Sequence, residues 1–237
     1  MFLSAFLKNY RQIKRRLEQT NMIFFAFGDI HMNAGNVESI PGIHSADQII
    51  ITGDITNFGS RKDAAKVIDK LMAVNTNIMG VAGNLDQPDV AEYLEDIGVS
   101  LHGKGKIING LGIVGLGGSN FTPFKTPYEF SEQQLATLLS QGISQVGEVK
   151  DHILVSHTPP FQTKTDKLLS GAHVGSTAVR TYIEQHQPLL CLTGHIHESR
   201  GQDNIGRTLI LNPGMVKNGG YIEILFENGE ISASLST

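Results

Sequence analysis

FFAFGDIHMN, residues 24–33, opens with four apolar residues and then turns to an aspartate and a histidine, Asp29 and His31, two positions apart. The apolar residues predict a short strand that is buried on both faces. A core strand gains nothing by ending in a carboxylate and an imidazole, because both groups are costly to bury without partners. The same ending recurs on other predicted strands, and this recurrence points to a shared site.

Four further apolar runs end in polar residues whose side chains ligate metals. At four of the five strand ends a glycine comes directly before the polar residue, and we expect it to allow a tight turn there. The side chains placed in this way are those of Asp29, His31, Asp54, Asn84, His157, His195 and His197.

Apolar runs alternate with amphipathic segments along the chain, which is typical of an α/β fold. Strands are predicted at MIFFAF, QIIIT, NIMGVA, HILVS, PLLCLT and RTLILN. Helices are predicted over residues 60–74, 88–97, 131–141 and 176–187, the third of them ending before Gly142. Residues 105–118 and 219–235 are predicted to form antiparallel hairpins, the second with a turn at Asn228-Gly229.

Ligands of open α/β sheets bind outside the carboxyl ends of the strands, so five such ends are expected to bring the seven side chains together. Seven oxygen and nitrogen donors exceed what one four-coordinate zinc ion uses. They suit two divalent ions, with one carboxylate bridging between them. Paired ions of this kind clamp the oxygens of a phosphoryl group during hydrolysis.

Composition narrows the class of protein further. The chain has 237 residues, is 40% hydrophobic and carries a formal charge of -4, which disfavours a nucleic-acid binder. Its one cysteine, Cys191, excludes an internal disulfide and is expected to be a buried, inert thiol. No stretch approaches the roughly 20 apolar residues of a membrane span, and we expect a cytoplasmic protein.

Residues 1–20 have apolar side chains at helical spacing and a basic cluster near the end, which predicts an amphipathic helix. We expect this helix to dock on the body of the protein or on a second copy in a homodimer. Attachment to a membrane surface or a partner protein is the alternative. Residues 21–237 are predicted to form a single domain.

Five sequence blocks, taken in order, resemble the signature of calcineurin-like metallophosphoesterases: GDIH at 28–31, GDIT at 53–56, GNLD at 83–86, SHTPP at 156–160 and GHIH at 194–197. NPG at 212–214 resembles the closing block of that family. The resemblance implies a four-layer αββα sandwich of two mixed β-sheets flanked by helices, so that residues 21–237 would be one metallophosphoesterase domain.

The resemblance also implies a role for each donor. Asp29, His31 and His197 would hold one metal, and Asn84, His157 and His195 the other, with Asp54 bridging the two. The ions would be manganese, iron or zinc. A hydroxide bridging them would hydrolyse a small-molecule phosphodiester or phosphomonoester, and Asn84 would also contact the substrate.

One position departs from the family pattern. Leu85 stands where the family often has a histidine that contacts the scissile phosphate and helps protonate the leaving group. His173, in the glycine-rich stretch GAHVGS, is a candidate catalytic and phosphate-binding replacement. Asp86 is a further candidate catalytic residue, which would act by orienting a metal ligand. Residues 117–127, GGSNFTPFKTP, resemble a loop of one archaeal and bacterial branch of the family. This segment would either shape a substrate pocket or be an ordinary surface loop.

Two other functions compete with a small-molecule phosphoesterase. The first is a catalytically weak or inactive scaffold that has the same fold and serves in a protein complex. Leu85 favours this alternative, because it replaces a histidine that the family often uses in catalysis. The second is a nuclease of the same family, against which the acidic balance argues. The remaining histidines, His44, His102, His152 and His186, are expected to be superficial or structural.

Overall fold

The structure, a computed structural model, describes residues 21–149 and 151–236. Its first sheet has, in spatial order, β13 (Glu230–Leu235), β12 (Ile222–Glu227), β1 (Met22–Phe27), β2 (Gln48–Ile51) and β3 (Ile78–Gly80). The strands β1, β2 and β3 are parallel, and β12 and β13 add to them as an antiparallel hairpin. The predicted amphipathic helix of residues 1–20 lies outside the described residues.

The second sheet has the order β10 (Gly201–Ile205), β11 (Thr208–Asn212), β9 (Leu190–Leu192), β8 (His152–Ser156), β5 (Leu111–Leu116) and β4 (Lys104–Ile108). Its four central strands are parallel and its two edge strands antiparallel. A two-stranded ribbon joins β6 (Ser119–Asn120) to β7 (Glu129–Phe130). Short 3₁₀ turns occur at η1 (Val37–Ser39), η2 (Ile43–Ser45), η3 (Lys164–Asp166), η4 (His197–Ser199) and η5 (Val216–Asn218).

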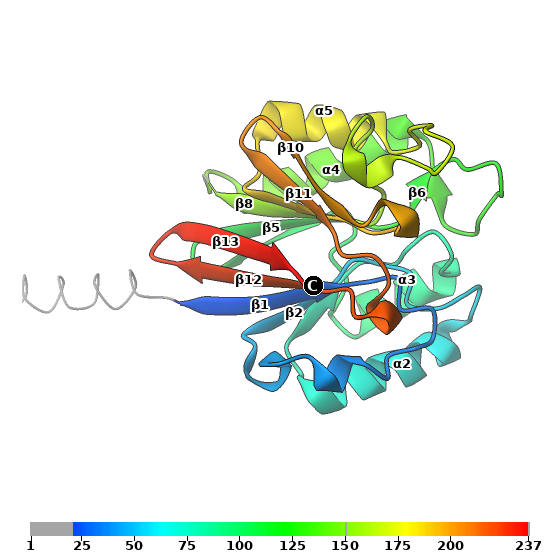
Figure 1. The fold of residues 1–237 in the computed structure, drawn as a ribbon, viewed down its shortest axis with the longest axis vertical. Helices are drawn as coiled ribbons and strands as arrows, with labels where there is room; N and C mark the ends of the chain where they lie inside the picture. The colour runs from blue at the N-terminus through cyan, green and yellow to red at the C-terminus, as the bar shows by residue number, and fades with distance from the viewer. Residues whose placement is uncertain (1–20, 150, 237) are drawn as a thin grey trace, which may run out of the picture.

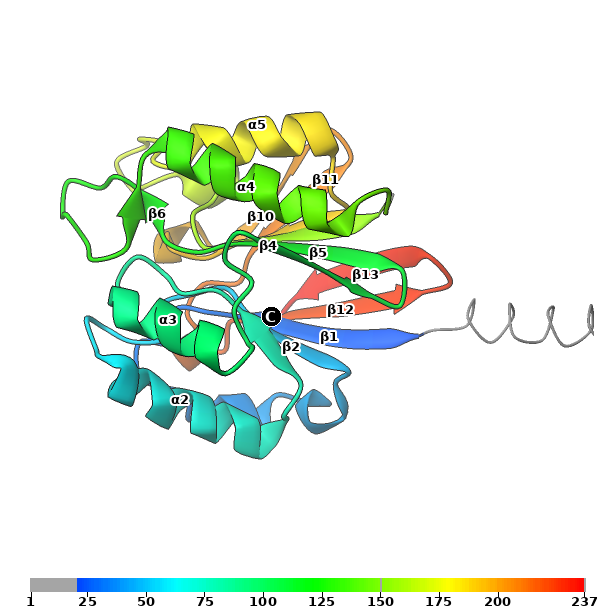
Figure 2. The same cartoon turned by 180° about the vertical axis from the view of Figure 1, so that it is seen from behind.

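Helices cover the outer face of each sheet, and the two inner faces pack together (Figures 1 and 2). The first sheet is covered by α2 (Arg61–Val74) and α3 (Pro88–Asp96), and the second by α4 (Glu132–Val146) and α5 (Thr177–His186). This arrangement confirms the expected αββα sandwich of two mixed sheets.

Both faces of the central strands are buried, which explains their continuous apolar runs. Phe24 and Ile50 point between the sheets and meet Ile153 of the second sheet. Their neighbours Phe25 and Ile49 point the other way, into the layer under α2 and α3. A one-residue slip of register would exchange these two sets between the two layers.

The predicted end of the third helix was wrong. Gly142 does not terminate α4, which continues to Val146. A Cβ at Gly142 would lie 2.8 Å from Val114 Cγ1 of β5 and 3.1 Å from the Lys104 carbonyl oxygen. The glycine therefore lets the helix pack closely on the sheet, a tertiary reason that local sequence does not reveal.

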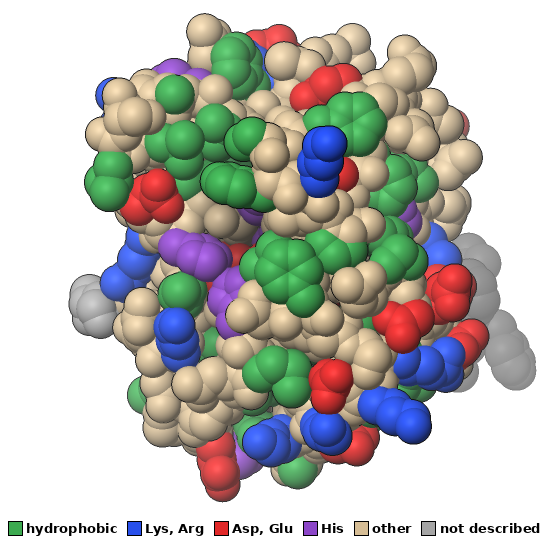
Figure 3. Space-filling model, turned by 90° about the vertical axis from the view of Figure 1, so that its right-hand side faces the viewer, with side chains coloured by type: hydrophobic (Ala, Val, Ile, Leu, Met, Phe, Trp, Pro, Cys, Tyr) green, Lys and Arg blue, Asp and Glu red, His purple; other side chains and the backbone are tan. Residues whose placement is uncertain are grey.

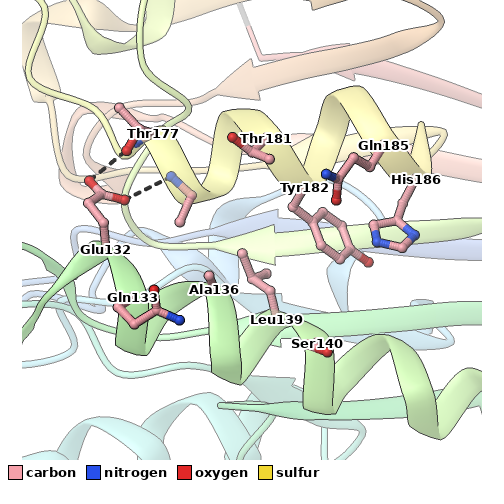
Figure 4. A pocket seen from close by; sticks show the side chains of 11 residues that line it. Glu132, Gln133, Ala136, Leu139, Ser140, Thr177, Thr181, Tyr182, Gln185 and His186 are labelled. Carbon is pink, nitrogen blue, oxygen red and sulfur yellow. Dashed lines mark hydrogen bonds between the residues drawn. The ribbon is translucent and has the colours of Figure 1, made fainter.

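Helices α4 and α5 lie side by side and enclose a groove of about 340 Å³ at the outer surface (Figure 4). Glu132, in the first turn of α4, accepts hydrogen bonds from the backbone N–H groups of Thr177 at 3.2 Å and Ala178 at 2.8 Å. A carboxylate at the start of a helix satisfies its free donors and complements its dipole. The contact fixes where α5 begins.

Both predicted hairpins are present. Asn109-Gly110 joins β4 to β5, and Asn228-Gly229 joins β12 to β13. All four residues have positive φ, as a type I′ turn requires. Within the described residues, none of the helices has the length and apolar character to cross a bilayer.

Candidate metal centre

The parallel strands of both sheets end at the same edge of the sandwich, where the connecting loops gather (Figure 1). Three donors from the first sheet and one from the second meet there. His31 Nε2 lies 3.1 Å from His197 Nε2 and 3.9 Å from Asp54 Oδ2. His197 Nε2 lies 3.3 Å from Asp29 Oδ1. One ligand atom from each of the four residues lies within 4.8 Å of the others.

The other predicted donors gather on the far side of Asp54. His157 Nε2 lies 3.5 Å from Asp54 Oδ1 and 3.0 Å from Asn84 Oδ1. The ring of His195 is 5.1 Å from that of His157, centroid to centroid. Asp54 therefore turns one carboxylate oxygen toward each group. The structure brings together all seven predicted side chains, which we call the metal cluster.

The backbone at the strand ends is strained in the same way at four members of the metal cluster. The φ angles of Asp29, His31, Asp54 and His195 are 49°, 46°, 49° and 68°, in the left-handed region that non-glycine residues seldom adopt. Hydrogen bonds hold this shape: the N–H groups of Ile30 and His31 both donate to the Asp54 carbonyl oxygen, at 2.8 and 2.9 Å.

The glycines before these residues have a different task from the one expected. Only Gly53, of the four, has a positive φ. A Cβ at Gly83 would lie 2.0 Å from Asp54 Oδ1, and one at Gly53 would lie 2.4 Å from His157 Nδ1. At Gly194 it would lie 2.9 Å from Asp29 Oδ2. The glycines chiefly leave room for donor side chains that arrive from neighbouring strands.

Two contacts that the sequence did not reveal orient individual donors. His157 Nδ1 lies 2.9 Å from the Thr52 carbonyl oxygen, so Nδ1 carries the proton and Nε2 faces Asp54 with a free lone pair. Asn84 Nδ2 donates to Thr126 Oγ1 at 2.9 Å, which turns its amide oxygen toward His157.

Asp86 is fully buried and its carboxylate does not reach the open side of the cluster. Its oxygens accept from the N–H groups of Ile55, Thr56 and Gly83 at 2.7–3.0 Å and from the Thr56 hydroxyl at 2.7 Å. These bonds tie the loop after β2 to the loop after β3. Asp86 thereby fixes the backbone on both sides of the strand ends that carry Asp54 and Asn84.

Negative charge accumulates in the cluster. Burial and the nearby carboxylates of Asp86 and Asp29 raise the pKa of Asp54 well above its ordinary value. Burial opposes ionisation of Asp29 and His197 alike, but their mutual contact outweighs it, lowering the pKa of Asp29 and raising that of His197. Among the described residues, no lysine or arginine forms a salt bridge with Asp29, Asp54 or Asp86.

The donor set suits divalent cations. Asp29 Oδ2 is buried and has no hydrogen-bond partner among the described residues, as a carboxylate oxygen reserved for a cation would be. Burial lowers the pKa of His157 to about 4 and that of His195 to about 3. Both imidazoles are therefore neutral at pH 7, the form in which histidine ligates metals. The cluster thus has the character of a divalent-metal site.

His173 lies away from the metal cluster, on the loop between β8 and α5, and lines the same cavity as Asp54, His195 and His197. Its Nδ1 lies 2.6 Å from Oδ1 of the buried Asp166, a partner that the sequence did not suggest. Asp166 is held in turn by the N–H groups of Gln162, Thr163 and Gly175. The pair leaves His173 Nε2 as the free nitrogen of a partly exposed, firmly oriented ring.

The cavity over the metal cluster has a volume of about 920 Å³. Residues of the 117–127 segment line it, including Phe121 and Phe124, so this segment shapes the cavity. Leu85 also lines it, at the position where the resembled family often has a histidine. Figure 3 views this face of the molecule and shows histidine side chains among hydrophobic ones.

The four histidines that were predicted to be superficial or structural do not line the cavity. His102 and His152 form hydrogen bonds within the fold, and His44 and His186 are exposed.

Two mixed sheets between helices, with aspartate and histidine side chains gathered at their carboxyl edge, define a class of α/β proteins with a metal site. The sequence model of the calcineurin-like phosphoesterases matches residues 22–199, and the chain belongs to that family. This match confirms the resemblance seen in the five sequence blocks.

One relative resembles the chain in sequence, and two solved structures resemble it in fold. The uncharacterized protein MJ1162 of Methanocaldococcus jannaschii is 39% identical over 174 residues, which are 71% of this chain and 77% of that protein. The structure of TT1561 from Thermus thermophilus has a TM-score of 0.66 at 19% identity, over 91% of this chain and 99% of that one. A dimetal phosphatase from Danio rerio has a TM-score of 0.56 at 12% identity, with the same coverage. At such identities the structural likeness shows the fold alone.

Proposed function

We propose that the protein is a metal-dependent hydrolase of small-molecule phosphate esters that works with two divalent ions. The observation that carries the proposal is the convergence of seven donor side chains from five strand ends, with Asp54 between the other six and each of its oxygens facing one group of donors. The Danio rerio structural neighbour, described as a dimetal phosphatase, supports it.

The proposed ligands fall into two sets. Asp29, His31 and His197 hold one ion, as their ligand atoms already lie within 4.8 Å of one another and of Asp54. Asn84, His157 and His195 would hold the other, and Asp54 would serve both ions, since a carboxylate has two oxygens to share. Manganese, iron and zinc all suit a mixture of imidazole, carboxylate and amide donors.

When bound, such ions neutralise charge on the phosphoryl oxygens and make water a nucleophile at neutral pH. The protein's own contribution is to hold the donors. Thr52 and Thr126 orient His157 and Asn84, while Asp86 acts as a positioning residue for the loop that carries Asp54. Asn84 also faces the cavity and is placed to contact the substrate.

His173 is the proposed general acid. Leu85, which has no proton to give, occupies the position where the family often has a histidine, so proton delivery must come from another wall of the cavity. His173 lies on such a wall, and Asp166 fixes its ring through Nδ1. Nε2 then donates a proton to the leaving oxygen of the substrate, a step typically worth 10²–10⁴-fold in rate.

A catalytically weak scaffold is the second candidate, and Leu85 is the observation that favours it. The intact donor set argues for catalysis. A nuclease is disfavoured, because neither lysine nor arginine is among the described residues that line the cavity. Cytoplasmic location and a homodimer stay predictions from the sequence.

Metal analysis followed by a phosphodiesterase assay tests the proposal. Purified protein loaded with manganese should retain two ions per chain and hydrolyse bis(4-nitrophenyl) phosphate. Asp54→Asn and His157→Ala should lose at least one ion and the activity, while His44→Ala, a change at an exposed histidine, should retain both. Two bound ions without turnover of any phosphate ester would favour the scaffold, and no bound metal would refute the proposal.

A further inference from the structure

Exposed aromatic side chains surround the metal cluster. Phe58, Phe121 and Phe124 are 55%, 67% and 83% exposed and all line the cavity, and we call them the apolar rim. Large apolar side chains seldom gather in solvent around a polar centre unless a ligand covers them. Leu85 and Phe161 extend the apolar lining inward from the rim.

The segment that carries two rim residues is held in place rather than free. Glu129 Oε1 accepts hydrogen bonds from the Thr122 hydroxyl at 2.6 Å and from the Thr126 N–H at 2.7 Å. These bonds close the turn from which Phe121 and Phe124 project. A preorganised aromatic surface binds a ligand without the entropic cost of ordering a loop.

Three polar side chains of the cavity wall are occupied by the protein itself. Asn120 donates to the Val174 carbonyl oxygen and accepts from the Thr158 hydroxyl. Thr122 and Thr126 donate to Glu129. A nucleobase would need several free donors and acceptors for its edge, and a polyphosphate would need cationic side chains, whereas the carboxylates that line the cavity are those of Asp54 and Glu198.

We propose that the preferred substrate is a phosphodiester with a bulky apolar substituent, alkyl or aryl, that packs against the apolar rim while the phosphate reaches the metal cluster. This inference rests on the proposed function and adds the substrate class. Leu85 belongs to the apolar wall in this account. Replacement of the family histidine at that position exchanges a polar contact to phosphate for a contact to the apolar substituent.

A series of esters with one leaving group tests the inference. Manganese-loaded protein is assayed with 4-nitrophenyl phosphodiesters whose second ester is methyl, hexyl, phenyl or thymidine 5′-yl. Each methylene removed from water changes an equilibrium constant about fourfold. The kcat/KM of the hexyl ester should therefore be at least about 20 times that of the methyl ester, mainly because its KM is lower. The kcat/KM of the phenyl ester should also be higher than that of the thymidine ester.

Rim variants localise the effect. Phe124→Ser and Phe121→Ser should lower the hexyl-to-methyl ratio at least about fivefold with no loss of bound metal. Ile107→Ser, a matched change at a 52% exposed residue of β4, should leave the ratio unchanged. The inhibition constants of hexylphosphonate and methylphosphonate, measured on the unmodified protein, test the same preference without any variant. Hexylphosphonate should inhibit more strongly than methylphosphonate.

The failures of the two proposals are distinguishable. A methyl ester hydrolysed as well as the hexyl ester, or a thymidine ester preferred to both, overturns the apolar substrate class and leaves the phosphoesterase intact. Failure to hydrolyse any ester, with metal bound, overturns the proposed function and this inference with it.

Discussion

The metal cluster and the apolar rim lie in one cavity but are built in opposite ways. Members of the cluster sit at strand ends and are mostly buried, and four of them have a left-handed backbone that hydrogen bonds hold in place. Rim residues are exposed and lie on connecting loops. The rigid sheets thus supply the chemistry, and the loops supply the preference among substrates.

The largest expected effect comes from crowding the cluster. A methyl group at Gly83 would meet Asp54 Oδ1 at 2.0 Å and the Asp54 backbone nitrogen at 2.2 Å. Gly83→Ala should therefore displace the bridging carboxylate, abolish binding of at least one ion and lower phosphodiesterase activity about 100-fold or more. Metal content and kcat/KM are the measurements.

Gly35→Ala is the matched control, because a Cβ there meets only Asn33 Oδ1 at an ordinary 3.5 Å. It should keep both ions and full activity. A Gly83→Ala protein with the metal content of the unmodified chain would contradict the packing described around Asp54.

A smaller loss is expected from the support behind the cluster. Asp86→Asn replaces one acceptor oxygen by an NH₂ group in a site where four donors converge. The new NH₂ group and the donors that face it repel each other, so metal affinity should fall about 10- to 100-fold and the midpoint of thermal unfolding should drop. Titration with Mn²⁺ and thermal denaturation measure both, with Asp69→Asn on exposed α2 as the control. Unchanged affinity would remove Asp86 from the positioning role.

The contrast between strand ends and loops also explains which site residues could be predicted from the sequence. The donors follow apolar strands of obvious length, and parallel strands share one edge, so Asp29, Asp54 and His157 were foreseeable from local pattern and topology. Asp166, Thr126 and the close-packed Gly142 were not, since their importance comes from contacts with residues 7 to 42 positions away or with a neighbouring layer. The segment 117–127, which carries Phe121 and Phe124, was predicted to shape a substrate pocket or to be an ordinary surface loop, and its residues alone did not decide between the two.

His173 connects the two regions, and its variant should affect catalysis without affecting metal binding. His173→Ala should lower kcat at least tenfold for esters of phenol, which need a proton on the leaving oxygen, and much less for esters of nitrophenol. Asp166→Asn should show the same dependence on leaving group to a smaller degree. Equal losses for both leaving groups would indicate a structural role only.

The smallest expected effect concerns the stability of the fold at His102, which is not a member of the cluster. Burial lowers the pKa of His102 to about 4, and its Nδ1 accepts a hydrogen bond from the Gly117 N–H, which also favours the neutral ring. The unfolded chain takes up this proton near pH 6.5 and the folded protein only near pH 4. The stability that neutral His102 contributes is therefore complete above pH 6.5 and declines as the pH falls toward 4.

Urea denaturation at pH 7.5, 6.0 and 5.0 measures the free energy of unfolding for this comparison. The His102→Gln protein should lose less stability between pH 7.5 and 5.0 than the unmodified protein, while its metal content stays the same. Parallel pH profiles for the two proteins would show that His102 does not titrate in this way.

A crystal structure of the manganese-loaded protein, with anomalous difference maps at the manganese edge, shows whether the seven donors hold two ions. Two peaks per chain are expected, one among Asp29, His31 and His197 and one among Asn84, His157 and His195, with Asp54 touching both. A single peak that Asp54 does not contact, or no peak at this edge of the sheets, would contradict the two-ion proposal.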